Sequence, residues 1–367
     1  MRLDFLRPLT DSDGPFATVV LDATHDTADA TEQYRLRWRD LRERLVDAGA
    51  EEPVLDLLDD AVTGAAAPDG TAGRVLVADR DRILLDRHTE IPPERGTAGW
   101  GALPDLLPVL SAVGEQVRTV VVAVDNTGGE VRSVDGWVEG VSSDSTGPVH
   151  KAGTAGPGEG GADARVEETW KRNAQAVAER VEKAVRGGNA GLLVVVGDAP
   201  ARARLRDELP PASAEVMVEI ENTGGTLPAQ VDDTVRAAAD DRREQRRIGS
   251  VTSYATASGR GEGLAVTGLA GVVAATRAHA VETLLVDRAD APGTALWLAA
   301  DPTAVAESRD ELAQIGAEPT VSAPAADALV RAAAAVDADV VLTGPGDDVA
   351  LTDGLGAVLR FPIGPVA

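Results

Sequence analysis

Cysteine is absent from this chain, and lysine and aromatic residues are scarce. The lack of cysteine excludes disulfides and thiolate chemistry. Lysine occurs only at Lys151, Lys171 and Lys183, and aromatic residues make up 3% of the 367 residues. No apolar run reaches the length of a signal-peptide core or a membrane span. We therefore expect a soluble cytoplasmic protein with no membrane segment.

Several common catalytic motifs are also missing. None of the lysines follows a glycine and precedes serine or threonine, so there is no Walker A loop. No serine lies between glycines two residues away on each side, which excludes the nucleophile elbow of α/β hydrolases. The four histidines (His25, His88, His150 and His279) lack metal-ligand spacing. The glycines of 156–161 do not complete a dinucleotide-binding fingerprint. The sequence predicts no metal site and no cofactor.

The charge balance is strongly acidic. Sixty acidic residues face 35 basic ones, giving a formal net charge of −25. Such a surface repels itself in dilute buffer, whereas molar salt shortens the screening length to about 3 Å. Together with the preference for arginine over lysine, this composition is typical of proteins from halophiles that accumulate salt; acidity for solubility is the simpler alternative. On the halophile hypothesis, overall acidity does not argue against an RNA partner.

Strands and helices alternate along the chain, which predicts an α/β protein of three domains, each with a mixed sheet and packed helices. We place the domains at residues 1–114, 115–228 and 229–367. The expected strands are 16–21, 74–78, 82–85, 118–125, 130–133, 136–141, 192–197, 214–220, 283–286, 295–298 and 339–342. The expected helices are 25–47, 53–62, 163–186, 200–208, 229–258, 269–277, 303–315 and 325–336. Residues 96–101 break the pattern and are expected to lie outside a strand.

A glycine-rich stretch, 147–162, leads directly into the helix expected at 163–186. Asp163 is the expected N-cap and Gly187 the stop signal. The segment 147–187 carries seven basic and six acidic residues, and all three lysines of the chain. Apolar residues recur at steps of three or four on one face of this helix: Val166, Trp170, Ala174, Val177, Val181 and Val185. A solvated loop before an ordinary packed helix is one interpretation; a mobile finger that enters an anionic site is the other.

Three sequence features together resemble the archaeo-eukaryotic class-one peptide-chain release factor superfamily, which includes Pelota. The glycine-rich loop reads Gly160-Gly161-Ala162 where release factors have Gly-Gly-Gln. The stretch from Gly263 to Leu269 and the later Ala280–Val286 resemble the entry into the third domain of the family. The tail Gly354-Leu-Gly-Ala-Val-Leu-Arg-Phe361 resembles the terminal strand. These features cover residues 117–367, and the resemblance implies that the central and C-terminal domains correspond to release factor domains two and three.

The first domain departs from decoding release factors. It contains neither Asn-Ile-Lys-Ser nor a Tyr-x-Cys motif, so stop-codon reading is not expected. Its opening, 14–26, and the stretch 38–42 resemble the bacterial and archaeal release-factor-like branch that includes Balon-type hibernation factors. The resemblance implies a ribosome-associated factor of hibernation or rescue type, which binds the tRNA site. It also implies a translational GTPase or recycling ATPase as partner of the C-terminal domain, with no DNA partner.

In release factors, the glutamine helps to orient a water molecule against the peptidyl-tRNA ester. Ala162 has no side-chain amide, so we expect ribosome binding without peptide release. A peptidyl-tRNA hydrolase or nuclease with a degenerate loop and an acidic scaffold that binds only protein remain alternatives. No catalytic residue is assigned beyond the loop position Gly160, Gly161 and Ala162. The expected RNA-binding residues are His150, Lys151, Arg165, Lys171, Arg172, Lys183, Arg242, Arg243, Arg246 and Arg247.

Overall fold

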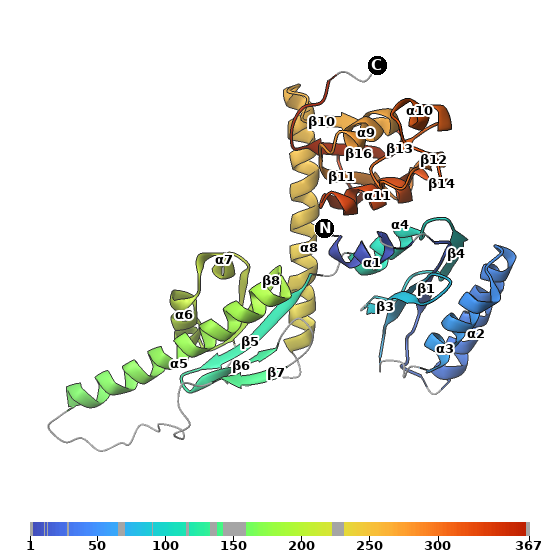
Figure 1. The fold of residues 1–367 in the computed structure, drawn as a ribbon. Helices are drawn as coiled ribbons and strands as arrows, with labels where there is room; N and C mark the ends of the chain where they lie inside the picture. The colour runs from blue at the N-terminus through green and yellow to red at the C-terminus, as the bar shows by residue number, and fades with distance from the viewer. Residues whose placement is uncertain are drawn as a thin grey trace. The chain divides into compact units, whose positions relative to one another are not determined.

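The structure is a computed structural model that describes residues 3–10, 12, 14–27, 29–64, 70–89, 91–114, 117–132, 138–141, 159–221 and 231–364. The chain divides into two compact units, one made of residues 1–115 with 247–367 and the other of residues 116–246. Helix α8 (Val231–Arg260) contributes to both. The described residues form four sheets (Figure 1), which confirms the prediction of an α/β protein. A mixed sheet was predicted for each domain; the sheets around β11 and β5 are mixed, whereas the N-terminal sheet and the small sheet β13-β12-β14 are antiparallel throughout. Among the described helices, none is long and apolar enough to cross a membrane.

The N-terminal sheet is antiparallel, with strand order β3-β2-β1-β4. Its strands are β1 (Phe16–Asp22), β2 (Gly73–Ala78), β3 (Ile83–Thr89) and β4 (Thr97–Gly101). Helices α2 (Ala30–Asp47) and α3 (Glu52–Gly64) pack on one face (Figure 1). Because side chains alternate along β1, Val19 and Leu21 face these helices. Buried Tyr34, Trp38, Leu41 and Leu45 of α2 meet them, as the sequence predicts.

The other face of this sheet is covered by short helical segments. They are η1 (Asp4–Leu6), α1 (Arg7–Thr10), α4 (Leu106–Val109) and η2, a π-helical turn (Leu110–Gly114). The same segments pack on helix α11 (Ala325–Ala335) of the C-terminal part. One apolar core therefore extends from the N-terminal sheet to the C-terminal sheet within this unit.

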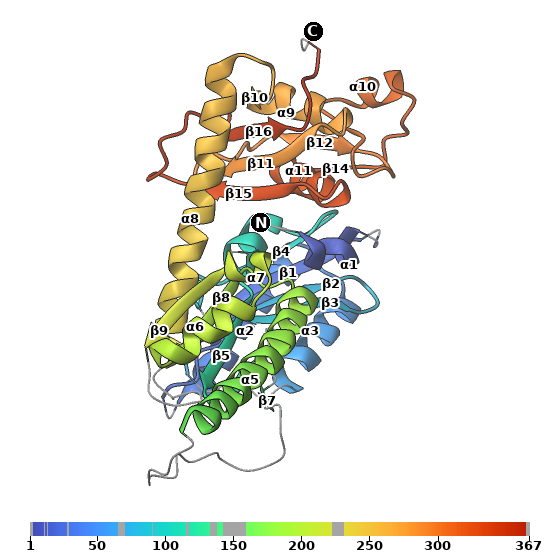
Figure 2. The same cartoon turned by 90° about the vertical axis from the view of Figure 1, so that its left-hand side faces the viewer.

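The C-terminal sheet has the order β10-β16-β11-β15, in which only β11 and β15 are parallel. Its strands are β10 (Ala265–Thr267), β11 (Val281–Asp287), β15 (Asp339–Thr343) and β16 (Leu355–Leu359). Helices α9 (Gly268–Arg277) and α11 share the core of one face. Tyr254 of α8 lies against Gly356 of β16, and Figure 2 shows α8 running along this sheet. A small sheet, β13-β12-β14, completes this part, with β12 (Ala295–Leu298), β13 (Val305–Ala306) and β14 (Val321–Pro324).

The second unit is built on the sheet β7-β6-β5-β8-β9, in which β5, β8 and β9 are parallel. Its strands are β5 (Thr119–Asp125), β6 (Gly128–Arg132), β7 (Val138–Val141), β8 (Leu192–Gly197) and β9 (Met217–Glu221). Helices α5 (Glu159–Gly188) and α6 (Ala199–Glu208) cover one face (Figure 2). The first half of α8 covers the other through Val231 and Ala239, and α7 (Pro211–Ala214) precedes β9.

Several predicted elements are wrong in extent or type. Residues 96–101 contain β4, whose two glycines conceal the strand pattern. The helix expected at 303–315 is β13 followed by the short α10 (Arg309–Gln314), because Ser308 caps a new helix by accepting from Glu311 N–H. The strand expected at 214–220 begins at Met217, since α7 occupies residues 211–214. The helix expected from His25 begins at Ala30, and His25 pairs with Gly70 in an isolated bridge.

Candidate functional site

Helix α5 begins earlier than expected. It starts at Glu159, so Gly160, Gly161 and Ala162 lie in its first turn and Asp163 is not the N-cap. Glycine lowers helix propensity by about 1 kcal/mol per residue but does not block a helical backbone. Residues 142–158, including the predicted RNA contacts His150 and Lys151, lie outside the described residues, as does the side chain of Arg165.

A polar cluster fixes α5 where it leaves the sheet. The Arg204 guanidinium of α6 lies over the half-buried ring of Trp170 on α5, 4.8 Å from the ring centre. It also donates to Asn126 Oδ1 at 2.8 Å, in the turn after β5. Asn173, one turn further along α5 and 5% exposed, donates to the Asn126 backbone oxygen at 2.9 Å. The cluster therefore joins α5, α6 and the carboxyl end of β5.

The turn that carries Asn126 is itself held by Asp125. One carboxylate oxygen of Asp125 accepts from the Thr127 N–H at 2.7 Å and from the Gly128 N–H at 3.1 Å. It also accepts from the Thr127 hydroxyl at 2.6 Å. These bonds order the turn locally, in the manner of an Asx-turn. A rigid turn presents both oxygens of Asn126 to α5 and α6.

The predicted basic residues of α5 lie on its exposed side. Lys171 Nζ is 4.0 Å from a Glu208 oxygen of α6, and its side chain is 64% exposed. Arg172 pairs with Glu168 one turn earlier at 3.1 Å, and Lys183 is exposed. On the opposite side of the helix, Ala174, Val177, Val181 and Val185 are buried, as predicted, whereas Trp170 is half-buried. The amphipathic pattern thus leaves these cations accessible to a partner.

The predicted arginines of α8 have partners within the fold. Arg242 and Arg246 both donate to the backbone oxygen of Gly191, at 3.4 Å each. Arg243 pairs with Asp240 at 2.8 Å. Arg247, in the other unit, pairs with Asp347, whose side chain is 5% exposed. The structure therefore gives each of the four arginines a partner inside its own unit.

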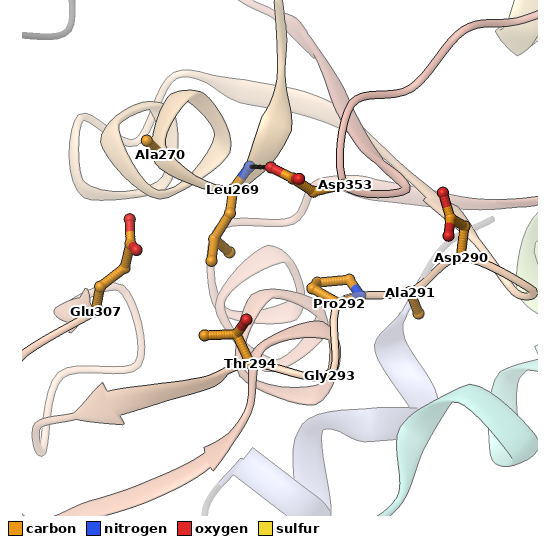
Figure 3. Close-up of a pocket in the computed structure, with 9 residues that line it drawn as sticks. All are labelled: Leu269, Ala270, Asp290, Ala291, Pro292, Gly293, Thr294, Glu307 and Asp353. Carbon is orange, nitrogen blue, oxygen red and sulfur yellow. Dashed lines mark hydrogen bonds between the residues drawn. The ribbon is translucent and has the colours of Figure 1, made fainter.

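The two family-like motifs of the C-terminal part meet at one pocket. Gly268 (φ +79°) and Gly354 (φ +63°) both have left-handed backbone that favours glycine. A Cβ on Gly354 would lie 2.2 Å from the Asp290 backbone oxygen, so a side chain is excluded there. Figure 3 shows Asp353 accepting from the Leu269 N–H, at 3.2 Å, at the start of α9. The pocket, of about 520 Å³, is lined by Leu269, Ala270, Asp290, Ala291, Pro292, Gly293, Thr294, Glu307 and Asp353.

Sequence reasoning missed Arg204 and Asn126. A signal for them exists in the chain: Trp170 is one of five tryptophans and lies where the apolar stripe of α5 passes the edge of the sheet. A large aromatic ring at that position favours a residue that packs over its face, and arginine is the cation that most often makes such a cation–π contact. In the described ranges, no group of three or more histidine, aspartate or glutamate residues is arranged to hold a metal ion.

Comparison of the sequence with known proteins gives matches of two kinds. The family model "Bacterial archaeo-eukaryotic release factor family 2" matches residues 118–260, which include the glycine-rich stretch, α5 and α8. The uncharacterized protein Rv2629 of Mycobacterium tuberculosis (strain ATCC 25618 / H37Rv) is 33% identical over 370 residues. That alignment covers 98% of this chain and 97% of the relative. MT2704 of strain CDC 1551 / Oshkosh matches with the same identity and coverage.

Solved structures resemble the chain more remotely. Dom34 of S. cerevisiae, described as interacting with Hbs1, has 10% identity and a TM-score of 0.43, over 98% of this chain and 92% of that chain. Archaeal Pelota, solved in a ribosome-bound model with ABCE1, has 15% identity and a TM-score of 0.38, over 99% and 96%. The sequence matches carry the assignment. The chain belongs to the family of Rv2629, and its residues 118–260 match the model of bacterial archaeo-eukaryotic release factor family 2.

Proposed function

We propose that this protein is a ribosome-associated translation factor of hibernation or rescue type, which binds the tRNA site and reaches toward the peptidyl-transferase centre without reading a stop codon. Family membership supports it: the release factor family 2 match spans the segment in which release factors carry Gly-Gly-Gln. The absence of stop-codon motifs from the first domain supports the part of the proposal that excludes stop-codon reading.

One observation carries the proposal: the first turn of α5 holds Gly160-Gly161-Ala162 on a helix anchored to its sheet. Arg204, Trp170 and Asn173 fix the helix at the sheet edge. A helix rises about 1.5 Å per residue, so Ala162 lies about 12 Å along the axis from Trp170. An anchored helix delivers its tip to a narrow site, but the alanine methyl cannot position a water molecule. On this proposal, the tip of α5 occupies the peptidyl-transferase centre and leaves the peptidyl-tRNA ester intact.

The exposed cations of α5 provide the attraction to RNA. Lys171 and Lys183 are two of only three lysines in a chain of net charge −25. Each cation that neutralises a phosphate releases counterions, so the affinity falls as salt rises. Overall acidity limits non-specific binding to RNA and leaves a local surface to select the site. We assign this surface to Lys171, Arg172 and Lys183, together with Lys151 and His150 of the preceding segment.

Co-sedimentation with ribosomes tests the proposal. We expect wild-type protein to pellet with large subunits or whole ribosomes, and the charge reversal K171E/R172E/K183E to reduce the bound fraction at least tenfold. The matched control is R35E/R39E/R95E, which reverses three exposed arginines of the N-terminal sheet region with the same change in net charge. It should bind within about twofold of wild type. Equal loss in both variants would show a general field effect and refute a docking surface on α5.

For the C-terminal part, we propose that the pocket at Asp353 belongs to the surface that binds a translational GTPase or recycling ATPase. Both glycine-bearing motifs that resemble the release factor superfamily line or border it. The substitution E307R reverses a lining charge at an exposed position and should abolish capture of that partner while ribosome binding persists. Retained capture would place the partner elsewhere.

A further inference from the structure

Within the unit formed by 1–115 and 247–367, a carboxylate of the C-terminal part accepts a hydrogen bond from the backbone of the N-terminal part. Asp327, in the first turn of α11, accepts a hydrogen bond from the Leu106 N–H at 2.8 Å. Leu106 is the first residue of α4, 221 positions away in the chain. Asp327 is 6% exposed, so this bond lies inside the shared apolar core.

Helix α4 requires this external acceptor. The first N–H groups of any helix lack partners in the helix itself. The residue at the N-cap position, Asp105, makes no side-chain cap bond; its own N–H donates to Thr18 Oγ1 of β1 at 3.0 Å. Asp327 therefore caps α4 from another part of the chain. Loss of the bond would leave a buried N–H unsatisfied, which costs about 1–3 kcal/mol in general.

The surroundings of Asp327 disfavour its charged form. Burial and, to a smaller extent, the nearby Asp105 carboxyl raise the pKa of Asp327 to about 7, against the opposing effect of the hydrogen bonds from the N–H groups of Leu106 and Leu107. Burial likewise raises the pKa of Asp105. Among the charged residues on the packed segments, Arg331 helps to lower the pKa of Asp301, and Arg7 pairs with Asp337 at 3.3 Å.

We propose that Asp327 and the N-terminus of α4 form a proton-dependent latch between the N-terminal and C-terminal sheets of this unit. In the closed form below about pH 7, Asp327 is mainly protonated and its carbonyl oxygen still accepts from the Leu106 N–H. When α4 separates from α11, the Asp327 carboxyl enters water, where the pKa of an aspartate is about 4. Closing therefore takes up a proton, and the stabilisation of the closed form is complete below about pH 4 and is lost as pH rises through about 7.

Amide hydrogen exchange of the full chain measures this latch directly. The protection factors of Leu106 and Leu107, corrected for intrinsic exchange, report the opening equilibrium even when the open form is rare. From a pKa of about 7 in the closed form, we expect both protection factors to fall about tenfold between pH 6 and pH 8 and to level off above that. Amides of Val19 and Val75, inside the N-terminal sheet, serve as the reference and should change by less than twofold.

Three variants separate the latch from general pH effects. D327N is neutral and keeps an oxygen that accepts from Leu106, so it should retain only the weaker pH response of Asp105. D105N removes the neighbouring charge and should move the midpoint of the fall in the protection factors to lower pH. In the double variant D105N/D327N, the protection factors should not change with pH. A wild-type protection factor that is constant from pH 5.5 to 8.5, or a tenfold change that persists in D327N, would overturn the proposal.

Discussion

The guanidinium of Arg204 lies 4.8 Å from the ring centre of Trp170 and ties helix α6 to helix α5 at the edge of the central sheet. Its bond to Asn126 adds the end of β5 to the same joint. Helix α5 is 30 residues long and its first turns extend past this joint. The direction of the Gly-Gly-Ala turn is therefore set by a few polar contacts, in addition to the valines buried further along the helix.

Replacing Arg204 tests the strength of this joint. R204A removes a cation–π contact and a hydrogen bond, and we expect the free energy of unfolding of the second unit to fall by about 1–2 kcal/mol. Urea denaturation of the full chain measures the loss. Arg206 of the same helix, 53% exposed and paired with Glu219, is the matched control, and R206A should cost less than about 0.5 kcal/mol. Equal losses in the two variants would show that Arg204 is an ordinary surface residue.

Two glycines of the second unit should respond differently to alanine. A Cβ on Gly197 would lie 2.3 Å from the Val124 backbone oxygen, so the parallel pair β5–β8 must move apart. A Cβ on Gly191 would meet Nη2 of Arg246 at 2.1 Å, and that side chain can rotate away. We expect G197A to destabilise the unit by about 3 kcal/mol or more and G191A by about 1 kcal/mol or less, measured by thermal denaturation. The reverse order would contradict the packing described above.

Arg74 provides a test in the N-terminal sheet. Its side chain is 3% exposed and forms two bonds with Asp86, at 2.8 and 2.7 Å, and one with the Tyr34 hydroxyl at 3.1 Å. D86A leaves a buried cation without its carboxylate, so we expect a loss of about 3–5 kcal/mol in unfolding free energy. The double variant R74M/D86A removes the cation as well and should recover at least half of that loss. No recovery would mean that Asp86 acts through packing alone.

Low salt should destabilise the protein, because the net charge of −25 repels itself when it is not screened. Circular dichroism in a potassium chloride series should show a melting temperature that rises steeply toward molar salt. A sodium sulfate series at matched ionic strength separates screening from salting-out. A melting temperature that does not change down to about 50 mM salt would refute the halophile hypothesis.

Elements with strong local patterns were predictable from the sequence. The nearly continuous apolar runs of β8 and β1 each identify a buried strand, and the apolar face of α2 identifies a helix. β4 was not predictable, because Gly99 and Gly101 interrupt its pattern and pairing with β1 decides its conformation. Helix α5 extends beyond its expected N-cap, since the residues before Asp163 also accept helical geometry.

The site was predictable only in part. The cations of α5 follow from helical periodicity alone, which places Lys171 and Arg172 away from the valine stripe. The joint at Trp170 depends on Arg204 and Asn126, which are 34 and 44 residues away in the chain, and on the parallel order of β5 and β8. Likewise, the sequence indicates only that Asp327 is an acidic residue in the first turn of α11. Its role as the cap of α4 is shown only by its contact with Leu106. Local pattern carries no information about such long-range partners.

The central claim, binding without peptide release, is tested most directly on wild-type protein incubated with ribosomes that carry peptidyl-tRNA. Pelleted ribosomes are analysed for bound protein, and the supernatant is analysed for freed peptide. We expect stoichiometric binding with the ester intact, at a release rate equal to that of ribosomes alone, because Ala162 has no side-chain amide to position water. Peptide release that is lost when residues 156–162 are replaced by a Gly-Ser linker would show that the loop is catalytic without glutamine and would contradict the claim.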